Sequence, residues 1–204
     1  EWVASQDGGT IIDSGGRITV NNPQAVAAVT RAAGWVRRIS PEGVLNYTEE
    51  ESRGVFQSGR AVFMRNWPYA WNLLQSPGSP VRGKVGIATL PADAGGRPAA
   101  TLGGWQLAVS RYSRHRDAAT SLVLHLVSRE EQKRRALAGG YHPTVPALYE
   151  DAELLASSPL FAALRGGLND AVARPAAAVG ADYNRVSHAF ANAVHAVLAG
   201  QSDA

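Results

Sequence analysis

The stretch GRAVFMRNWPYAW, residues 59–71, places three aromatic rings within five residues: Trp67, Tyr69 and Trp71. Such side chains are scarce elsewhere, because Phe, Tyr and Trp together make up 7% of the chain. Residues 61–64 predict a short buried strand, and Pro68 stops regular structure just past its end. The cluster favours an exposed aromatic platform, which suits flat, hydroxyl-rich ligands such as sugars. A hydrophobic turn buried in the core is the alternative, because aromatic side chains most often serve packing.

Helix signals lie on both sides of this stretch. Asn22 and Pro23 supply a cap and a first helical residue, and apolar residues follow at helical spacing. Thr48 and Glu51 form a capping box, in which the Thr48 side chain caps a helix and the Glu51 carboxylate hydrogen-bonds back to the amide of Thr48. A second capping box begins at Ser128. These signals predict a chain that is rich in short helices.

Short strands are predicted between the helices. Residues 85–88 form one apolar segment that ends before Pro91, and residues 106–109 form another. Near the end of the chain, residues 186–198 carry a strong apolar helical face that stops at Gly200. The predicted fold class is therefore α/β, helix-rich with short strands.

Composition excludes several classes of protein. The 204 residues are 45% hydrophobic, which suits one or two domains, and no apolar run reaches the roughly 20 residues of a membrane span. Cysteine is absent, which excludes disulfides and thiolate metal sites. The net charge is only +3, and basic clusters such as residues 133–135 have acidic neighbours. This pattern favours a solvated helix surface over a nucleic-acid interface, so no nucleic-acid partner is expected. The chain lacks a leader and an initiator Met, which favours a mature form or a fragment.

The sequence offers no catalytic motif. Neither a Gly-x-Ser-x-Gly elbow nor a His-Glu-x-x-His helix occurs, and His188 and His195 are too far apart to share one metal. The paired carboxylates stand at helix starts, where the helix dipole explains them. We therefore expect a binding protein that uses no metal and no cofactor.

Several segments in order carry a family resemblance. They are FQSGRA at residues 56–61, NWPYAW at 66–71, GIATLP at 86–91, GGWQLAVS at 103–110 and Arg174-Pro175 followed by Tyr183. Together they resemble the C-terminal half of an ABC-transporter sugar-binding protein. The resemblance is to the trehalose/maltose-binding group of the family-1 extracellular solute-binding proteins, and it runs the length of the chain.

The resemblance implies part of a two-lobed fold, that of the type II periplasmic binding proteins. It assigns about 1–80 and 114–204 mainly to the C-terminal lobe and about 81–113 to the N-terminal lobe. It implies that the N-terminal half of the same protein is missing and that this piece alone binds sugar poorly. A permease in the membrane is the implied partner of the complete protein. The implied location is extracellular or periplasmic, with a lipid anchor on the full-length protein.

The resemblance also implies a ligand site for an α-linked disaccharide or related carbohydrate. By this resemblance, Trp67 and Tyr69 are expected to stack on the sugar, and Trp105 supplies another ring. Gly104 lets the backbone approach a hydroxyl group. Arg174 resembles an arginine of the family that donates hydrogen bonds to sugar hydroxyls. Trp71 and Trp35 are expected in the core instead.

Two other functions stay open at this point. A carbohydrate-processing enzyme fragment needs two carboxylates beside the aromatic platform, and Asp93 and Asp182 are the only candidates. A helical interaction module would use the apolar face of residues 186–198 to dock on a partner.

Overall fold

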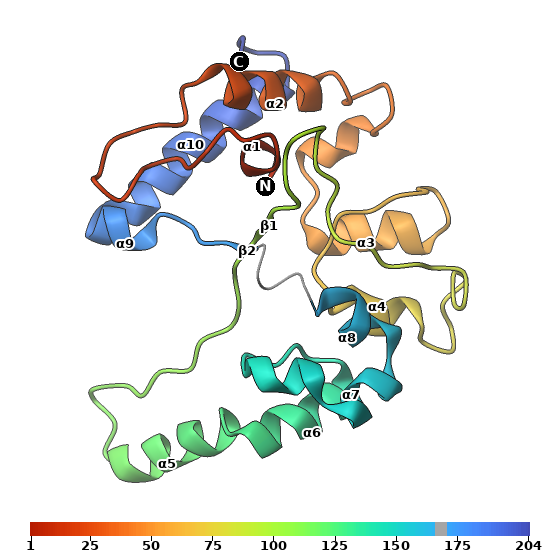
Figure 1. Cartoon of the computed structure of the whole chain (residues 1–204), viewed down its shortest axis with the longest axis vertical. Helices are drawn as coiled ribbons and strands as arrows, with labels where there is room; N and C mark the ends of the chain where they lie inside the picture. The colour runs from red at the N-terminus through yellow and green to blue at the C-terminus, as the bar shows by residue number, and fades with distance from the viewer. Residues whose placement is uncertain (166–170) are drawn as a thin grey trace. The chain divides into compact units, whose positions relative to one another are not determined.

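The computed structural model describes residues 1–165 and 171–204, and Figure 1 shows that helices dominate this part of the chain. It divides into two compact units. Unit 1 comprises Glu1–Ser52, Thr89–Leu102 and Gly167–Ala204, and unit 2 comprises Arg53–Ala88 and Gly103–Gly166. The predicted assignment of about 1–80, 81–113 and 114–204 to two lobes concerns a complete binding protein and stays a prediction.

Both units are built mainly from short helices. Unit 1 contains α1 (Trp2–Ser5), α2 (Pro23–Ala33), η1 (Glu42–Leu45), β1 (Ala100–Thr101), β2 (Ala171–Val172), α9 (Ala176–Val179), η3 (Gly180–Asp182) and α10 (Tyr183–Leu198). Unit 2 contains α4 (Ala70–Leu74), α5 (Arg116–Leu126), α6 (Arg129–Gly139), η2 (Pro146–Glu150), α7 (Ala152–Ser157) and α8 (Pro159–Leu164). Helix α3 (Glu49–Gln57) begins in unit 1 and ends in unit 2.

Unit 1 is organised around the pair α2 and α10. Helix α2 begins where the sequence predicts, because the Asn22 side chain accepts a hydrogen bond from the amide of Ala25 at 2.9 Å. Its buried residues are Ala25, Ala28 and Ala32, whose small side chains let α10 pack closely against it. Helix α10 therefore has a partner inside unit 1, although none of its residues is fully buried. This packing counts against the use of α10 as a free docking helix.

The strands differ from those that the sequence predicts. Strands β1 and β2 pair in parallel, with Ala100 opposite Ala171 and Thr101 opposite Val172. The segments predicted as strands, 61–64, 85–88 and 106–109, join no ladder within residues 1–165 and 171–204. Apolar alternation gives a segment its strand tendency, but a strand forms only where a neighbour supplies ladder hydrogen bonds.

The core of unit 2 lies where α6, η2, α7 and α8 meet. Ala136, Leu148, Leu154 and Phe161 form one cluster, and each is at most 2% exposed. Caps set the ends of these helices: Ser128 accepts from the amide of Glu131 at 3.3 Å, as its capping box predicts. Helix α6 stops at Gly140, whose φ of 68° favours glycine and whose Cα lies against the side chain of Asn72.

A half-buried histidine lies beside this core. The ring of His142 lies 5.5 Å from that of Phe161, and its Nδ1 is 3.2 Å from the hydroxyl of Tyr149. Tyr149 donates its only hydroxyl hydrogen to the carbonyl of Pro143 at 3.1 Å, so Nδ1 of His142 must be the donor to Tyr149. Nε2 of His142 is then a bare acceptor, and it is buried without a hydrogen-bond partner among the described residues. Burial lowers the pKa of His142 to about 4 and raises that of Tyr149 to about 12.

Acid is expected to destabilise unit 2 through His142. Its pKa is about 6.5 in the unfolded chain and about 4 in the folded one, so the unfolded chain binds more protons between these values. The contribution of His142 to the free energy of unfolding is fully present above about pH 6.5 and is lost as the pH drops toward 4. The loss between pH 7 and 5 is about 1–2 kcal/mol. Urea unfolding at a series of pH values measures this slope. In His142→Gln the slope above pH 5 should flatten, and an unchanged slope would contradict the assignment to His142.

Candidate functional site

The aromatic turn, residues 66–71, joins an extended segment of unit 2 to helix α4. Pro68 interrupts the segment, and two turn hydrogen bonds follow: the amide of Ala70 donates to the carbonyl of Trp67 at 3.2 Å, and that of Trp71 to Pro68 at 3.1 Å. Ahead of the turn, the amide of Trp67 donates to the side-chain oxygen of Asn66 at 2.7 Å. The turn therefore has a defined backbone that fixes where its indole rings start.

A hollow of about 160 Å³ lies next to this turn, within unit 2, and is called the aromatic hollow below. Its lining residues come from the turn, from Met64 just ahead of it, from α3, α4 and α8, and from the segment 85–88. They are Phe56, Met64, Asn66, Trp67, Pro68, Ala70, Trp71, Leu74, Val85, Gly86, Ile87, Ala88, Leu160 and Leu164. All of them are uncharged, so the aromatic hollow can bind an uncharged ligand by apolar and aromatic contact with a few hydrogen bonds.

Both indoles of the aromatic turn are half-buried and line the hollow. Trp71, which the sequence assigns to the core, thus lines the same hollow as Trp67, one of the rings expected to stack on the ligand. The guanidinium of Arg65 lies 5.2 Å from the centre of the Trp67 ring, a cation–π distance. Such a contact holds the ring in place and contributes about 0.5–1 kcal/mol at an exposed site.

The other predicted site residues are placed differently. Tyr69 is half-buried beside α4 and is absent from the lining of the aromatic hollow. Gly104 lies in open space: among the described residues, no atom comes within 4 Å of the position that a Cβ would take there. The Trp105 side chain is fully exposed at 103%. Arg174 belongs to unit 1 and is exposed. Within unit 2, the hollow therefore contains only one of the predicted residues, Trp67.

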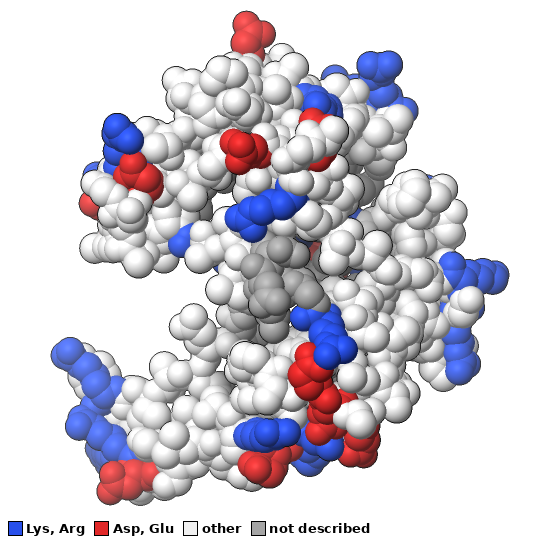
Figure 2. Space-filling view, in the orientation of Figure 1, with Lys and Arg blue, Asp and Glu red and all other residues white. Residues whose placement is uncertain are grey.

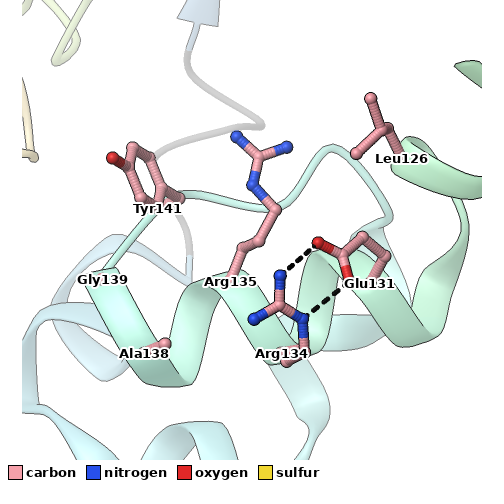
Figure 3. A pocket seen from close by; sticks show the side chains of 7 residues that line it. All are labelled: Leu126, Glu131, Arg134, Arg135, Ala138, Gly139 and Tyr141. Carbon is pink, nitrogen blue, oxygen red and sulfur yellow. Dashed lines mark hydrogen bonds and ion pairs between the residues drawn. The ribbon is translucent and has the colours of Figure 1, made fainter.

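A second hollow of about 460 Å³ lies between the end of α5 and helix α6 (Figure 3). Figure 3 shows Arg134 facing Glu131, and the two hydrogen bonds between them measure 2.7 and 2.6 Å. Arg134 thereby lowers the pKa of Glu131, which is only 8% exposed. Arg135 lies over the Tyr141 ring at 5.2 Å. The sequence pattern missed this hollow, because it depends on how α5 and α6 meet.

The carboxylates considered for an enzyme have arginine partners in unit 1. Asp93 lies 2.9 Å from Arg31, and Asp182 lies 3.1 Å from Arg185. The hydrogen bond from Arg31 lowers the pKa of Asp93, which disfavours the protonated form that a glycosidase acid needs. No group of three or more His, Asp or Glu side chains suited to a metal lies within residues 1–165 and 171–204.

Charges of both signs are interspersed on the face shown in Figure 2. In unit 2, Lys133 lies 2.9 Å from both Asp151 and Glu153, which raises the pKa of Lys133. The basic cluster at 133–135 is thus partly neutralised, as its acidic neighbours predict. In the described part of the chain, no helix has the length and apolarity that a membrane crossing requires.

Comparison with known proteins identifies a family. Residues 2–133 match the family described as bacterial extracellular solute-binding protein. A "probable ABC transporter-binding protein" of Deinococcus radiodurans is 50% identical over 202 residues, which cover 99% of this chain and 48% of that protein. A Sinorhizobium fredii protein, named as a probable amino-acid ABC transporter periplasmic-binding protein, is 30% identical over 81% of this chain and 37% of its own length.

Solved structures show the same fold. Maltose-bound MalE3 of T. maritima superimposes with a TM-score of 0.89 at 41% identity, over 99% of this chain and 52% of that one. A ribitol-bound ABC transporter solute-binding protein of Agrobacterium radiobacter matches with a TM-score of 0.78, over 99% of this chain and 52% of its own, and at 24% identity it supports the fold alone. These neighbours are type II periplasmic binding proteins, so the predicted helix-rich α/β fold class is confirmed.

The chain spans about half the length of the curated relatives it matches, and the aligned residues cover 48% of one and 37% of the other. The match at residues 2–133 covers more than half of the chain, and the members of the matched family are binding proteins rather than enzymes. The predicted resemblance is therefore confirmed, and the chain belongs to the family of bacterial extracellular solute-binding proteins.

Proposed function

We propose that the complete protein is the solute-binding component of an ABC sugar importer and that it binds an α-linked disaccharide or a related carbohydrate by aromatic stacking. The observation that carries this proposal is the aromatic hollow, where the indoles of Trp67 and Trp71 line one cavity with the amide of Asn66. Indole faces stack on the C–H faces of a sugar, and an amide both donates and accepts hydrogen bonds. The maltose in the MalE3 structure supports the choice of an α-linked disaccharide.

The lining of the hollow favours a sugar over an amino acid, the ligand named for one relative. An amino acid brings a carboxylate and an ammonium group, and each needs a charged or strongly polar partner when it leaves water. The described lining contains no charged side chain, so both groups of an amino acid would lose solvation without a partner there. A sugar carries no charge and therefore loses less solvation free energy when it enters the hollow.

The size of the hollow indicates that it holds only part of a disaccharide. Ligand pockets measure roughly 300–1,000 Å³, whereas the aromatic hollow measures about 160 Å³. We propose that further contacts come from Tyr69, Gly104, Trp105 and Arg174, the residues that the family resemblance implies. A micromolar site needs roughly 8 kcal/mol of net binding. Stacking adds only about 0.5–1.5 kcal/mol per ring beyond the apolar area that the ring buries, and the hollow holds only part of the ligand, so the 204-residue chain alone should bind sugar poorly.

The proposed partners follow from the proposed function. An ABC permease in the membrane receives the sugar from the binding protein. Ligand binding shifts the two lobes of the binding protein from an open to a closed arrangement. The family description and the printed names of the relatives support an extracellular or periplasmic location. We also propose that a lipid anchor attaches the full-length protein to the membrane.

Calorimetric titration of the complete protein tests the function. Maltose and trehalose probe the sugar class, and a mixture of neutral and charged amino acids probes the alternative. We expect at least one disaccharide to bind with micromolar affinity and the amino acids to give no heat. Binding of an amino acid with no response to any sugar would overturn the proposal.

A further inference from the structure

A cluster of arginines lies where the chain enters helix α5. Arg111, Arg114 and Arg116 are close together in sequence, and all three are exposed. In Figure 2 a blue patch lies at the lower left, where α5 begins in Figure 1. The stretch 110–117 contains a single carboxylate, that of Asp117. This stretch is called the arginine turn below.

The three arginines of this turn differ from other cations of unit 2, because they lack a carboxylate partner. Elsewhere in unit 2, Lys133, Arg134 and Arg165 each form an ion pair with an Asp or Glu side chain. In the part of the chain that the structure describes, no carboxylate forms an ion pair with an arginine of the arginine turn. Their charge is therefore available to an external partner.

Local hydrogen bonds gather these charges into one surface. The guanidinium of Arg116 donates to the carbonyl of Arg111, which holds the two ends of the turn together. Between them, the amide of Ser113 donates to the carbonyl of Ser110 at 3.0 Å. The amide of His115 donates to the Ser113 hydroxyl at 3.1 Å. The chain thus presents its arginines as a group, and their remaining guanidinium N–H groups can donate to a ligand.

An aromatic side chain belongs to the same surface. Tyr112 is 79% exposed, and the guanidinium of Arg111 lies 4.8 Å from the centre of its ring. Tyrosine combines an apolar ring with a polar hydroxyl, and it is enriched where a membrane meets water. The arginine turn lines neither of the two hollows described above, so it offers charge and an amphipathic ring rather than a cavity.

We propose that the arginine turn binds the anionic headgroups of membrane phospholipids and so docks unit 2 on the membrane surface. Arginine donates paired hydrogen bonds to phosphate oxygens, and a layer of headgroups requires complementary charge rather than a shaped pocket. A protein partner would need an apolar contact area, and Tyr112 is the only large apolar side chain of the turn. The proposal rests on the membrane location proposed above.

The strength expected of three arginines suits a protein that is also anchored. Each basic residue near an anionic surface strengthens binding by about fivefold, so three strengthen it on the order of a hundredfold. A single acyl chain gives only marginal, reversible membrane binding, and a basic patch is one of the second signals that make anchoring stable. The arginine turn would supply this signal and determine which side of unit 2 faces the bilayer.

Vesicle flotation of the complete protein, prepared without lipid modification, tests the proposal. Vesicles of phosphatidylglycerol and phosphatidylcholine in equal parts are compared with vesicles of phosphatidylcholine alone. At low ionic strength we expect at least about tenfold tighter binding to the anionic vesicles. At about 1 M salt, where the Debye length is about 3 Å, this preference should disappear.

Three variants define the surface. Joint replacement of its arginines, Arg111→Ser, Arg114→Ser and Arg116→Ser, should lower binding to anionic vesicles to the level seen with phosphatidylcholine. The corresponding triple lysine variant keeps the charge and should stay within about threefold of the wild type. The matched control removes the same charge by serine replacement of three exposed arginines in other segments, and it should lose less than about twofold. These three are Arg60, Arg82 and Arg97.

The outcomes separate this proposal from its alternatives. Equal binding of the wild type to both kinds of vesicle would overturn it. Equal losses in the two serine variants would also overturn it, because binding would then reflect net charge alone. Retention on immobilised polyglutamate without vesicle binding would assign the surface to an acidic protein instead. Sugar titration of the arginine-turn variant should match the wild type, so a failure of vesicle binding is distinguishable from a failure of the proposed sugar function.

Discussion

Replacement of Trp67 by alanine in the complete protein is expected to weaken disaccharide binding more than about a hundredfold. The Trp67 ring lines the aromatic hollow and is held by Arg65, so it is already positioned before the ligand arrives. Pre-positioned tryptophans in desolvated pockets contribute about 2–4 kcal/mol when truncated, and about 2.8 kcal/mol corresponds to a hundredfold change in Kd. Calorimetric titration with the sugar that binds the wild-type protein measures the effect.

Arg65→Ala is the matched control for this variant. It keeps the indole and removes the cation that lies 5.2 Å from the ring centre, so a loss of about twofold to fivefold is expected. Circular dichroism and urea unfolding verify that both variants stay folded. An affinity of folded Trp67→Ala within twofold of the wild type would refute the stacking role, whatever sugar the protein binds.

Helix starts were predictable from sequence because their signals are local. Asn22 caps α2 as predicted, and the carboxylate of Glu51 accepts from the amide of Thr48 at 2.9 Å, as the capping box ahead of α3 requires. Each signal depends on residues within one helical turn. Nothing distant has to be known for such a bond to form.

Strands were harder to predict because a ladder joins residues far apart in sequence. The pair formed by Ala100–Thr101 and Ala171–Val172 lacks a distinctive local pattern, and it was missed. The more apolar segment 106–109 looked like a strand but has no ladder within the described residues. A partner strand decides the outcome, and a local pattern holds no information about the partner.

The candidate site shows the same division between local and distant information. The aromatic turn was recognisable because its rings are neighbours in the chain. The hollow beside the turn was not recognisable, because its lining also includes Phe56 of α3, Leu160 of α8 and the segment 85–88. The half-buried position of Trp71 likewise depends on this packing. The residue types at a site can thus be read locally, whereas its lining requires the fold.

Replacement of Phe161 by alanine is expected to lower the free energy of unfolding of unit 2 by about 3–5 kcal/mol. The Phe161 side chain is 1% exposed and packs with Ala136, Leu148 and Leu154, so its removal leaves a cavity at the junction of α6, η2, α7 and α8. The cost combines the lost transfer of the ring from water with the loss of contacts around the cavity. A domain is typically stable by only 5–15 kcal/mol, so much of the margin disappears.

Leu124→Ala separates burial from the mere loss of an apolar side chain. Leu124 is 63% exposed, and its truncation should change the free energy of unfolding by less than about 0.5 kcal/mol. Urea unfolding of both variants, with hydrogen exchange of α6 and α8 to assign the change to unit 2, compares them directly. Because the core cluster contains Phe161 and excludes Leu124, equal losses in the two variants would mean that this cluster does not hold unit 2 together. A loss confined to Phe161→Ala would instead identify that ring as the contact on which the packing of α6, α7 and α8 depends.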